Sequence, residues 1–143
     1  MNNGHFYYPM PQNEPVLGYA PGSKERDALQ KALKELKAQP ADIPMYIGAE
    51  EVRTGEKVSL HAPHEHAHVL GYFHKGDASH ATKAIQAALA AKQQWAGLSW
   101  ANRASIFLKA ADLIATKYRA VLNAATMLGQ MRGSSAGSPP VGP

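Results

Sequence analysis

The sequence predicts an α/β chain with three helices and a few short strands. Apolar residues recur at three- and four-residue spacing in three stretches, which is the period of a helix that buries one face. Between the first and second of these stretches lie short runs of β-type residues separated by turn residues. At 143 residues the chain is long enough for one domain with a core of its own.

Residues 1–22 are predicted to form an extended N-terminal arm. Proline fixes φ and lacks an amide hydrogen, so the four prolines of this stretch disfavour helix and sheet. Ser23 is then a suitable N-cap for a first helix over residues 24–38. The apolar residues of that helix form a single stripe, which is typical of a helix that covers a larger body. They are Leu29, Leu33 and Leu36.

The next part of the chain is predicted to form short strands. "MYIG" (45–48) and "VSL" (58–60) are β-type runs, and "TGEK" (54–57) contains a turn, so we expect a hairpin with loops here. "HVLGYFHKGD" predicts one more strand over residues 67–74.

Two further helices and a tail are predicted after these strands. Asp77 can cap a helix over 78–96, and Ser99 can cap a third helix over 100–128. Both helices carry apolar residues at 3-4 spacing, which predicts a buried face on each. These residues are Ala81, Ala84, Ala88, Ala91 and Trp95 in the second helix, and Ala104, Phe107, Ala111, Ile114, Tyr118, Val121, Ala125 and Leu128 in the third. Residues 131–143 are rich in Gly, Ser and Pro, and we expect a disordered tail.

"HAPHEHAH" (61–68) contains four histidines, and His74 and His80 follow. Alternate residues of a strand share a face, so His64, His66 and His68 would line one side, where two of them could bind zinc or copper. Glu65 would point to the opposite face. The alternative is a polar strand edge that binds nothing, and neither an HExxH helix nor a cysteine supports a metal site.

Composition and charge exclude several classes of protein. The net charge is +4, but acidic residues lie among the lysines, as in "SKERDALQKALKELK", whereas a nucleic-acid-binding face concentrates Lys and Arg. We therefore expect no nucleic acid as a partner.

No stretch is apolar enough to span a membrane, and the N-terminus does not have the pattern of a signal peptide. The absence of cysteine fits a reducing compartment, so we expect a cytoplasmic protein.

Several ordered stretches resemble the aldehyde dehydrogenase family over nearly residues 13–130. The general pattern is an Ala-rich helix ending at Trp95, followed by a helix that opens with Arg103 and carries "FLKAADLI" (107–114). The finer match is to the N-terminal portion of the 1-pyrroline-5-carboxylate dehydrogenase branch of that family. It rests on "NEPVLGYAPGSKERDALQKALKELK", "AIQAALAAKQQW", "RASIFLKAADLI" and "AATMLGQ". The family has a proline- and histidine-containing strand entry where this chain has its histidine-rich tract, which implies a scaffold role for the tract.

The resemblance implies a fold, a reaction and a cofactor. Residues 23–130 would be the N-terminal portion of an NAD-binding domain, and the parent enzyme would oxidise L-glutamate γ-semialdehyde, its small-molecule substrate, to glutamate in proline degradation. A cysteine thiolate would attack the aldehyde, hydride would pass to NAD, and water would cleave the thioester with help from a glutamate.

The sequence lacks the residues and the cofactor-binding motif that this chemistry needs. The chain has no cysteine, and it has no Gly-rich strand–loop–helix unit for a dinucleotide. We therefore assign no catalytic, cofactor-binding or metal-binding residue, and we expect a truncated fragment that binds no cofactor and is inactive alone. Such a fragment would self-associate through exposed apolar faces. The alternative is a non-catalytic helical interaction module.

Overall fold

The structure, a computed structural model, describes residue 10 and residues 12–130. The elements follow the chain in this order: α1 (Lys24–Ala38), β1 (Ala41–Ile43), β2 (Met45–Ile47), β3 (Glu50–Val52), β4 (Lys57–Ala62), β5 (Glu65–His74), α2 (Ala78–Gly97), α3 (Trp100–Ala115) and α4 (Arg119–Gln130). The part of the predicted arm that is described, residues 12–22, contains no helix or strand. The predicted tail, residues 131–143, lies outside the described residues. No helix in the described part is long and apolar enough to cross a membrane.

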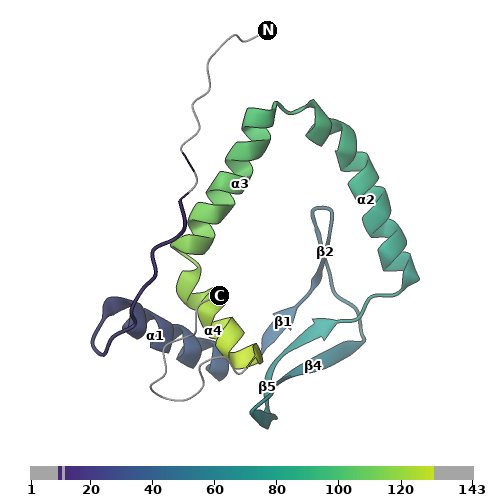
Figure 1. Cartoon of the computed structure of the whole chain (residues 1–143). Coiled ribbons are helices and arrows are strands. Elements are labelled where there is room, and N and C mark those ends of the chain that lie inside the picture. The colour runs from purple at the N-terminus through teal and green to yellow at the C-terminus, as the bar shows by residue number, and fades with distance from the viewer. Residues whose placement is uncertain (1–9, 11, 131–143) are drawn as a thin grey trace.

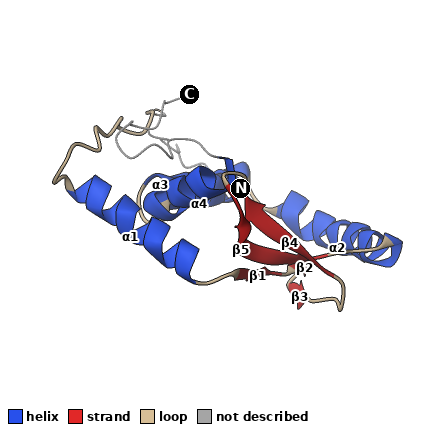
Figure 2. Cartoon of the chain, turned by 90° about the horizontal axis from the view of Figure 1, so that it is seen from below, coloured by secondary structure: helices blue, strands red, loops and turns tan. Residues whose placement is uncertain are grey.

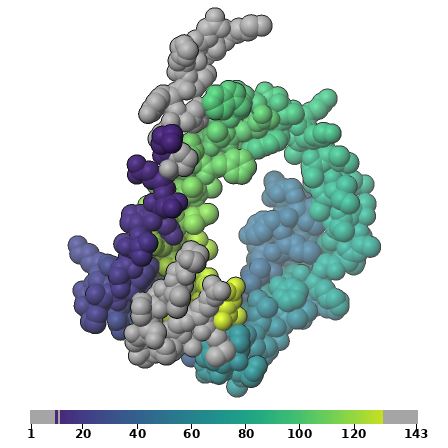
Figure 3. All heavy atoms as spheres, viewed as in Figure 1, coloured from purple at the N-terminus to yellow at the C-terminus, as the bar shows by residue number. Residues whose placement is uncertain are grey.

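The elements are arranged as an open ring. The strands lie between α1 on one side and α2 on the other (Figures 1 and 2), while α2 and α3 form an arch that leads from the sheet back to α4. The space-filling view shows an opening through the molecule inside this arch (Figure 3). The two helices of the arch contain no buried residue.

A three-stranded sheet in the order β1-β5-β4 forms one side of the ring. β1 is parallel to β5, and β4 is antiparallel to β5 with a register irregularity at His61. Gly71 of β5 faces the backbone of β1 so closely that a Cβ there would stand 2.5 Å from the Ala41 carbonyl oxygen. β2 and β3 form a separate antiparallel hairpin, whose turn uses Gly48 at a positive φ of 63°.

The buried core of the described chain is small and lies where α1 packs on α4. Leu29, Ala32 and Ala124 are buried there. Half-buried side chains surround them, among them Leu33 and Leu36 of the predicted stripe. The prediction for the first helix is thus confirmed in its bounds, its N-cap Ser23 and the face it buries.

The prediction of a single third helix over 100–128 is wrong, because the chain breaks between α3 and α4. Thr116 leaves the helical conformation, and both its backbone N–H and its hydroxyl donate to the Asp112 carbonyl, at 3.0 and 2.6 Å. The Tyr118 N–H donates to the Leu113 carbonyl at 2.9 Å. These bonds satisfy the last carbonyl groups of α3 and end it. The break allows α4 to turn and pack against α1, so the described chain has four helices instead of three.

The prediction that the second and third helices each bury one face is also wrong for α2 and α3 of this chain. The bounds are nearly as expected and Asp77 is the N-cap, but α2 and α3 contain no buried residue. Large apolar side chains on these helices are more than half exposed, for example Ile85 and Leu89 on α2 and Phe107 on α3. The physical reason is that, among the helices and strands of the described chain, α2 has its main contact with β2 and α3 has its main contact with α4.

The strand predictions are partly confirmed. The expected strand over 67–74 exists as β5 and begins two residues earlier. A hairpin also forms, but its turn lies at Gly48, while "TGEK" connects β3 to β4. Glycine takes positive φ at little cost, so the earlier position is the easier one for a tight turn.

Candidate functional site

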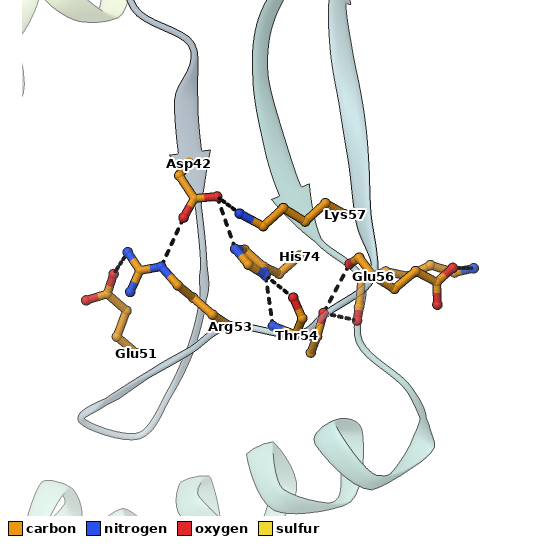
Figure 4. A network of polar contacts seen from close by, with 8 residues as sticks. Asp42, Glu51, Arg53, Thr54, Glu56, Lys57 and His74 are labelled. Atoms are coloured by element: carbon orange, nitrogen blue, oxygen red, sulfur yellow. Dashed lines mark hydrogen bonds and ion pairs between the residues drawn. The ribbon is translucent and has the colours of Figure 1, made fainter.

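A network of polar side chains joins β1, the start of β4 and the end of β5 to the β3–β4 loop (Figure 4). His74 is the last residue of β5, Asp42 is in the middle of β1, and Thr54 lies in the loop. The parallel pairing of β1 with β5 brings Asp42 opposite Tyr72, close to the end of β5. Lys57, the first residue of β4, pairs with His74 across the antiparallel ladder. The sheet therefore places these groups together.

His74 is at the centre of this network and is the only buried polar residue among those described. Its Nδ1 lies 2.8 Å from the Thr54 amide nitrogen and 2.8 Å from the Thr54 carbonyl oxygen. Its Nε2 lies 3.1 Å from Oδ1 of Asp42. A neutral ring satisfies this geometry when the Thr54 N–H donates to Nδ1 and the Nε2–H donates to Asp42.

Two cations lie on the carboxylate of Asp42. Lys57 Nζ donates to Oδ1 at 2.8 Å, and Arg53 Nε donates to Oδ2 at 3.0 Å. These bonds, first that of Lys57 and then that of Arg53, hold the pKa of the Asp42 carboxyl well below its ordinary range. The same contact raises the pKa of Arg53, which also pairs with Glu51. The charged carboxylate of Asp42 therefore links β1 to β4, to β5 and to the β3–β4 loop.

The arrangement of Asp42 and His74 resembles part of a catalytic triad, but it lacks the third member. A triad needs a hydroxyl or thiol within reach of the imidazole. The nearby hydroxyl is that of Thr54, and its contacts are the carbonyl oxygens of Glu56 and Lys75, at 3.1 and 3.0 Å. Both ring nitrogens of His74 already have partners in the network. We conclude that the network positions backbone and is not a centre for acid–base chemistry.

The histidine-rich tract does not form the row expected of a regular strand. His64 lies in the turn between β4 and β5, so only His66 and His68 belong to the strand. His61 is held by the His66 carbonyl and the Ser59 hydroxyl, at 2.8 and 2.9 Å. Glu65 pairs with Lys37 of α1 at 2.6 Å. Among residues 10 and 12–130, no three potential ligands are close enough together to hold a metal ion.

The start of α2 does not fit the diphosphate of a dinucleotide. A helix N-terminus binds phosphate through free backbone N–H groups. Here the Asp77 carboxylate accepts the N–H groups of Ser79 and His80, at 2.8 and 3.1 Å, and the His80 ring completes a capping box. The Ser79 hydroxyl also donates to this carboxylate, at 2.7 Å, and is the largest cause that holds the pKa of Asp77 below its ordinary range. A carboxylate therefore occupies the place that a phosphate would need.

The connection between the parallel strands also differs from that of an NAD-binding fold. A dinucleotide fold joins parallel strands through a helix that crosses over the sheet. The parallel strands β1 and β5 are instead joined through the β2–β3 hairpin and β4. Neither the start of α2 nor the connection between β1 and β5 therefore has the form of a dinucleotide site, and the cysteine that would supply a thiolate is absent from the sequence.

Two other surfaces have possible functional meaning. A shallow depression of about 400 Å³ lies between β2 and the start of α2. Two of its polar groups, Asp77 and His80, are bonded to each other. The second surface is the apolar arch of α2 and α3 described above, which exposes most of the large apolar side chains of those two helices.

The sequence interpretation missed the network of His74. Asp42 and His74 are 32 residues apart, and no local pattern connects them. The available signal was weak: a lone acidic residue in a short β-type run and a histidine at the end of a predicted strand.

Comparison with known proteins places the chain among dehydrogenases. The model of the aldehyde dehydrogenase family matches residues 50–136. Over 126 residues the chain is 50% identical to a delta-1-pyrroline-5-carboxylate dehydrogenase of Agaricus bisporus, which covers 87% of this chain and 23% of the relative. It is 49% identical over 118 residues to the mitochondrial delta-1-pyrroline-5-carboxylate dehydrogenase of Homo sapiens, covering 82% of this chain and 21% of the relative.

Solved structures agree with the sequence relatives. The crystal structure of the delta-pyrroline-5-carboxylate dehydrogenase from Mycobacterium tuberculosis, bound with NAD and cobalamin, superposes with a TM-score of 0.86 and 42% identity. The match covers 90% of this chain and 24% of that chain. The chain thus spans about a quarter of the length of the proteins it matches, and its mixed helices and strands correspond to an N-terminal portion of their fold.

Proposed function

Because this chain belongs to the aldehyde dehydrogenase family, we propose that it is part of an enzyme that oxidises L-glutamate γ-semialdehyde, formed from 1-pyrroline-5-carboxylate, to glutamate with NAD. The observation that carries the proposal is the identity of 50% over 126 residues to a relative named for this activity. The relatives are about four times longer than the matched region, so the activity belongs to the whole enzyme.

Within such an enzyme, residues 23–130 would form the N-terminal portion of the NAD-binding domain. The exposed apolar arch supports this role, because α2 and α3 need a body to pack against. The chain would supply no catalytic group, since it has no cysteine and the N-termini of α1, α2 and α3 are capped by its own side chains at Ser23, Asp77 and Ser99. NAD, when bound by the whole enzyme, would accept the hydride, and the residues of this chain would hold the scaffold in place.

A chimera tests the proposal directly. The region of the M. tuberculosis enzyme that matches this chain would be replaced by residues 12–130, and NADH formation from 1-pyrroline-5-carboxylate would be followed by absorbance. We expect activity within about tenfold of the parent, since no group that touches substrate changes. The control is the same exchange with the matching region of an aldehyde dehydrogenase that acts on another substrate. A chimera that is folded and binds NAD but does not oxidise the substrate would contradict the proposal.

The second candidate is a non-catalytic interaction module, which the exposed side chains of α2 and α3 also favour. In either case the 143-residue chain alone should self-associate through the arch. A module that folds by itself should unfold cooperatively in urea, whereas a chain that needs the rest of a dehydrogenase should bind a hydrophobic dye and lack a cooperative transition. The two measurements separate the candidates.

We also propose a cytoplasmic location, which the composition favours. Several relatives are named mitochondrial, so the location requires its own measurement. Fractionation of the source cells with detection of the chain by mass spectrometry would test it.

A further inference from the structure

A single cation lies within the apolar face of α2. Successive residues of a helix are about 100° apart, which defines an arc of about 160°, from Ala91 to Leu89, that holds the large apolar side chains of this helix. Ile85 and Trp95 lie on this arc, and so does Lys92, about 20° from Ile85. Every other polar side chain of α2 lies on the remaining part of the circumference. Lys92 is therefore a charged residue near the middle of a face that is otherwise apolar.

The arch itself supplies no counter-ion for Lys92. Its ammonium group makes no hydrogen bond or ion pair within the part of the chain that the structure describes. α2 contains no acidic residue, and Asp112, the only one in α3, pairs with Lys109 at 3.1 Å. The β2–β3 hairpin approaches another side of α2, where a Cβ at Gly48 would stand 3.4 Å from Ala87, about 140° from Lys92 around the helix.

The side chains beside Lys92 determine what happens to its charge. Ile85 and Leu89 are 61% and 62% exposed, so a body that covers the arch takes these side chains out of water and the stem of Lys92 with them. An ammonium group removed from water is costly unless an opposite charge pairs with it. The polar side of α2 begins about 80° away around the helix, so the middle of the arc is far from that edge.

The charge of the surrounding chain favours a carboxylate as the partner. Residues 78–130 carry six Lys and Arg side chains and one Asp, a net charge of +5. A surface that complements this part of the chain is acidic.

We propose that Lys92 forms a buried ion pair with a carboxylate of the body that covers the arch. The inference rests on the proposed function, in which that body is the rest of the dehydrogenase. It adds the chemistry of the contact, which is an acidic side chain set among apolar ones and opposite the middle of α2. Apolar contacts alone allow a helix to slide or rotate, whereas one paired charge fixes its register on the partner.

Amide hydrogen exchange in α2, read by mass spectrometry, tests the pair in two proteins. One is the chimera described above, in which the arch is covered, and the other is the 143-residue chain alone. Lys92→Met keeps the length of the stem and removes the charge, whereas Lys92→Arg keeps a charge. Lys83→Met is the matched control, because Lys83 is exposed on the same helix about 180° from Lys92.

We expect α2 of the unsubstituted chimera to exchange at least about tenfold more slowly than α2 of the chain alone. In the chimera, Lys92→Met should speed exchange in α2 at least about tenfold, because it leaves a carboxylate buried without its partner. Lys92→Arg and Lys83→Met should stay within about threefold of the unsubstituted chimera. In the chain alone, Lys92→Met should also stay within about threefold, since no carboxylate pairs with Lys92 there.

Three results would overturn the ion pair. Unchanged or slower exchange in the chimera with Lys92→Met would show that the ammonium group reaches water instead of a carboxylate. Equal effects of Lys92→Met and Lys83→Met would assign the change to the helix as a whole. An α2 that exchanges as fast in the chimera as in the chain alone would show that this body does not cover it. None of these readouts uses NADH formation, so a protected α2 with the Lys92 effect but no activity would contradict the proposed function alone.

Discussion

Truncation of Leu29 is the sharpest test of how this chain folds. The side chain is 6% exposed and lies against Ala32 and Ala124, where α1 packs on α4. Leu29→Ala removes buried carbon atoms and leaves a gap, which costs about 2 to 5 kcal/mol in well-packed cores. The neighbours Leu33 and Leu36 are only half buried and can move into the gap. We therefore expect a loss near the lower end, about 2 kcal/mol.

Two assays would measure this loss. In a chain that unfolds cooperatively, urea unfolding followed by circular dichroism should show the midpoint falling by about 1 M, given a slope of about 1 to 3 kcal/mol per molar urea. Amide hydrogen exchange read by mass spectrometry should show faster exchange in α4 as well as in α1, although the substitution is only in α1. The exchange measurement does not require a two-state transition.

Leu122→Ala is the matched control. It removes the same atoms from α4, but Leu122 is 44% exposed, so the expected loss is below about 1 kcal/mol. Equal effects of the two substitutions, or unchanged exchange in α4 with Leu29→Ala, would show that α1 does not pack on α4 as described.

Three further predictions concern the sheet, the arch and the network. Gly71→Ala should abolish the pairing of β1 with β5, because a Cβ there overlaps the β1 backbone, whereas Gly55→Ala meets open space and should change the urea midpoint little. Phe107→Glu should reduce self-association measured by sedimentation, because Phe107 is 66% exposed on the arch, while Ser105→Glu on the polar side of α3 should not. Asp42→Asn should lower stability at pH 7, because the pKa of Asp42 is depressed in the folded chain and its charged contacts stabilise the fold above the ordinary carboxyl value of about 4. The difference from wild type should shrink as the pH falls below that value, and a constant difference would contradict the cause assigned to the shift.

The helix starts could be predicted from the sequence because their causes are local. Ser23, Asp77 and Ser99 each accept from a backbone N–H two or three residues ahead, so the residues that decide each start are adjacent. The stripe on α1 could be predicted for a similar reason. Its spacing shows which face is apolar, and the structure supplies α4 to cover it.

The break at Thr116 could not be predicted from apolar spacing, because the 3-4 pattern continues through it. What decides it is the packing of α4 on α1, a contact between the two ends of the described chain. Once that contact is made, Thr116 is suited to the break, since its hydroxyl competes for the Asp112 carbonyl. The network of His74 escaped prediction for the same reason, because it depends on the parallel pairing of β1 with β5.

The exposed surface of α3 distinguishes the two proposed functions. Ile106, Phe107 and Leu108 are consecutive and are 50%, 66% and 46% exposed. Successive residues of a helix are about 100° apart, so these three side chains span about 200° of its circumference. A single partner helix covers a stripe about 100° wide and would leave at least one of them in water. A body that surrounds α3 on two sides can cover all three, which favours a place inside a larger dehydrogenase domain over an interaction module that binds one helix.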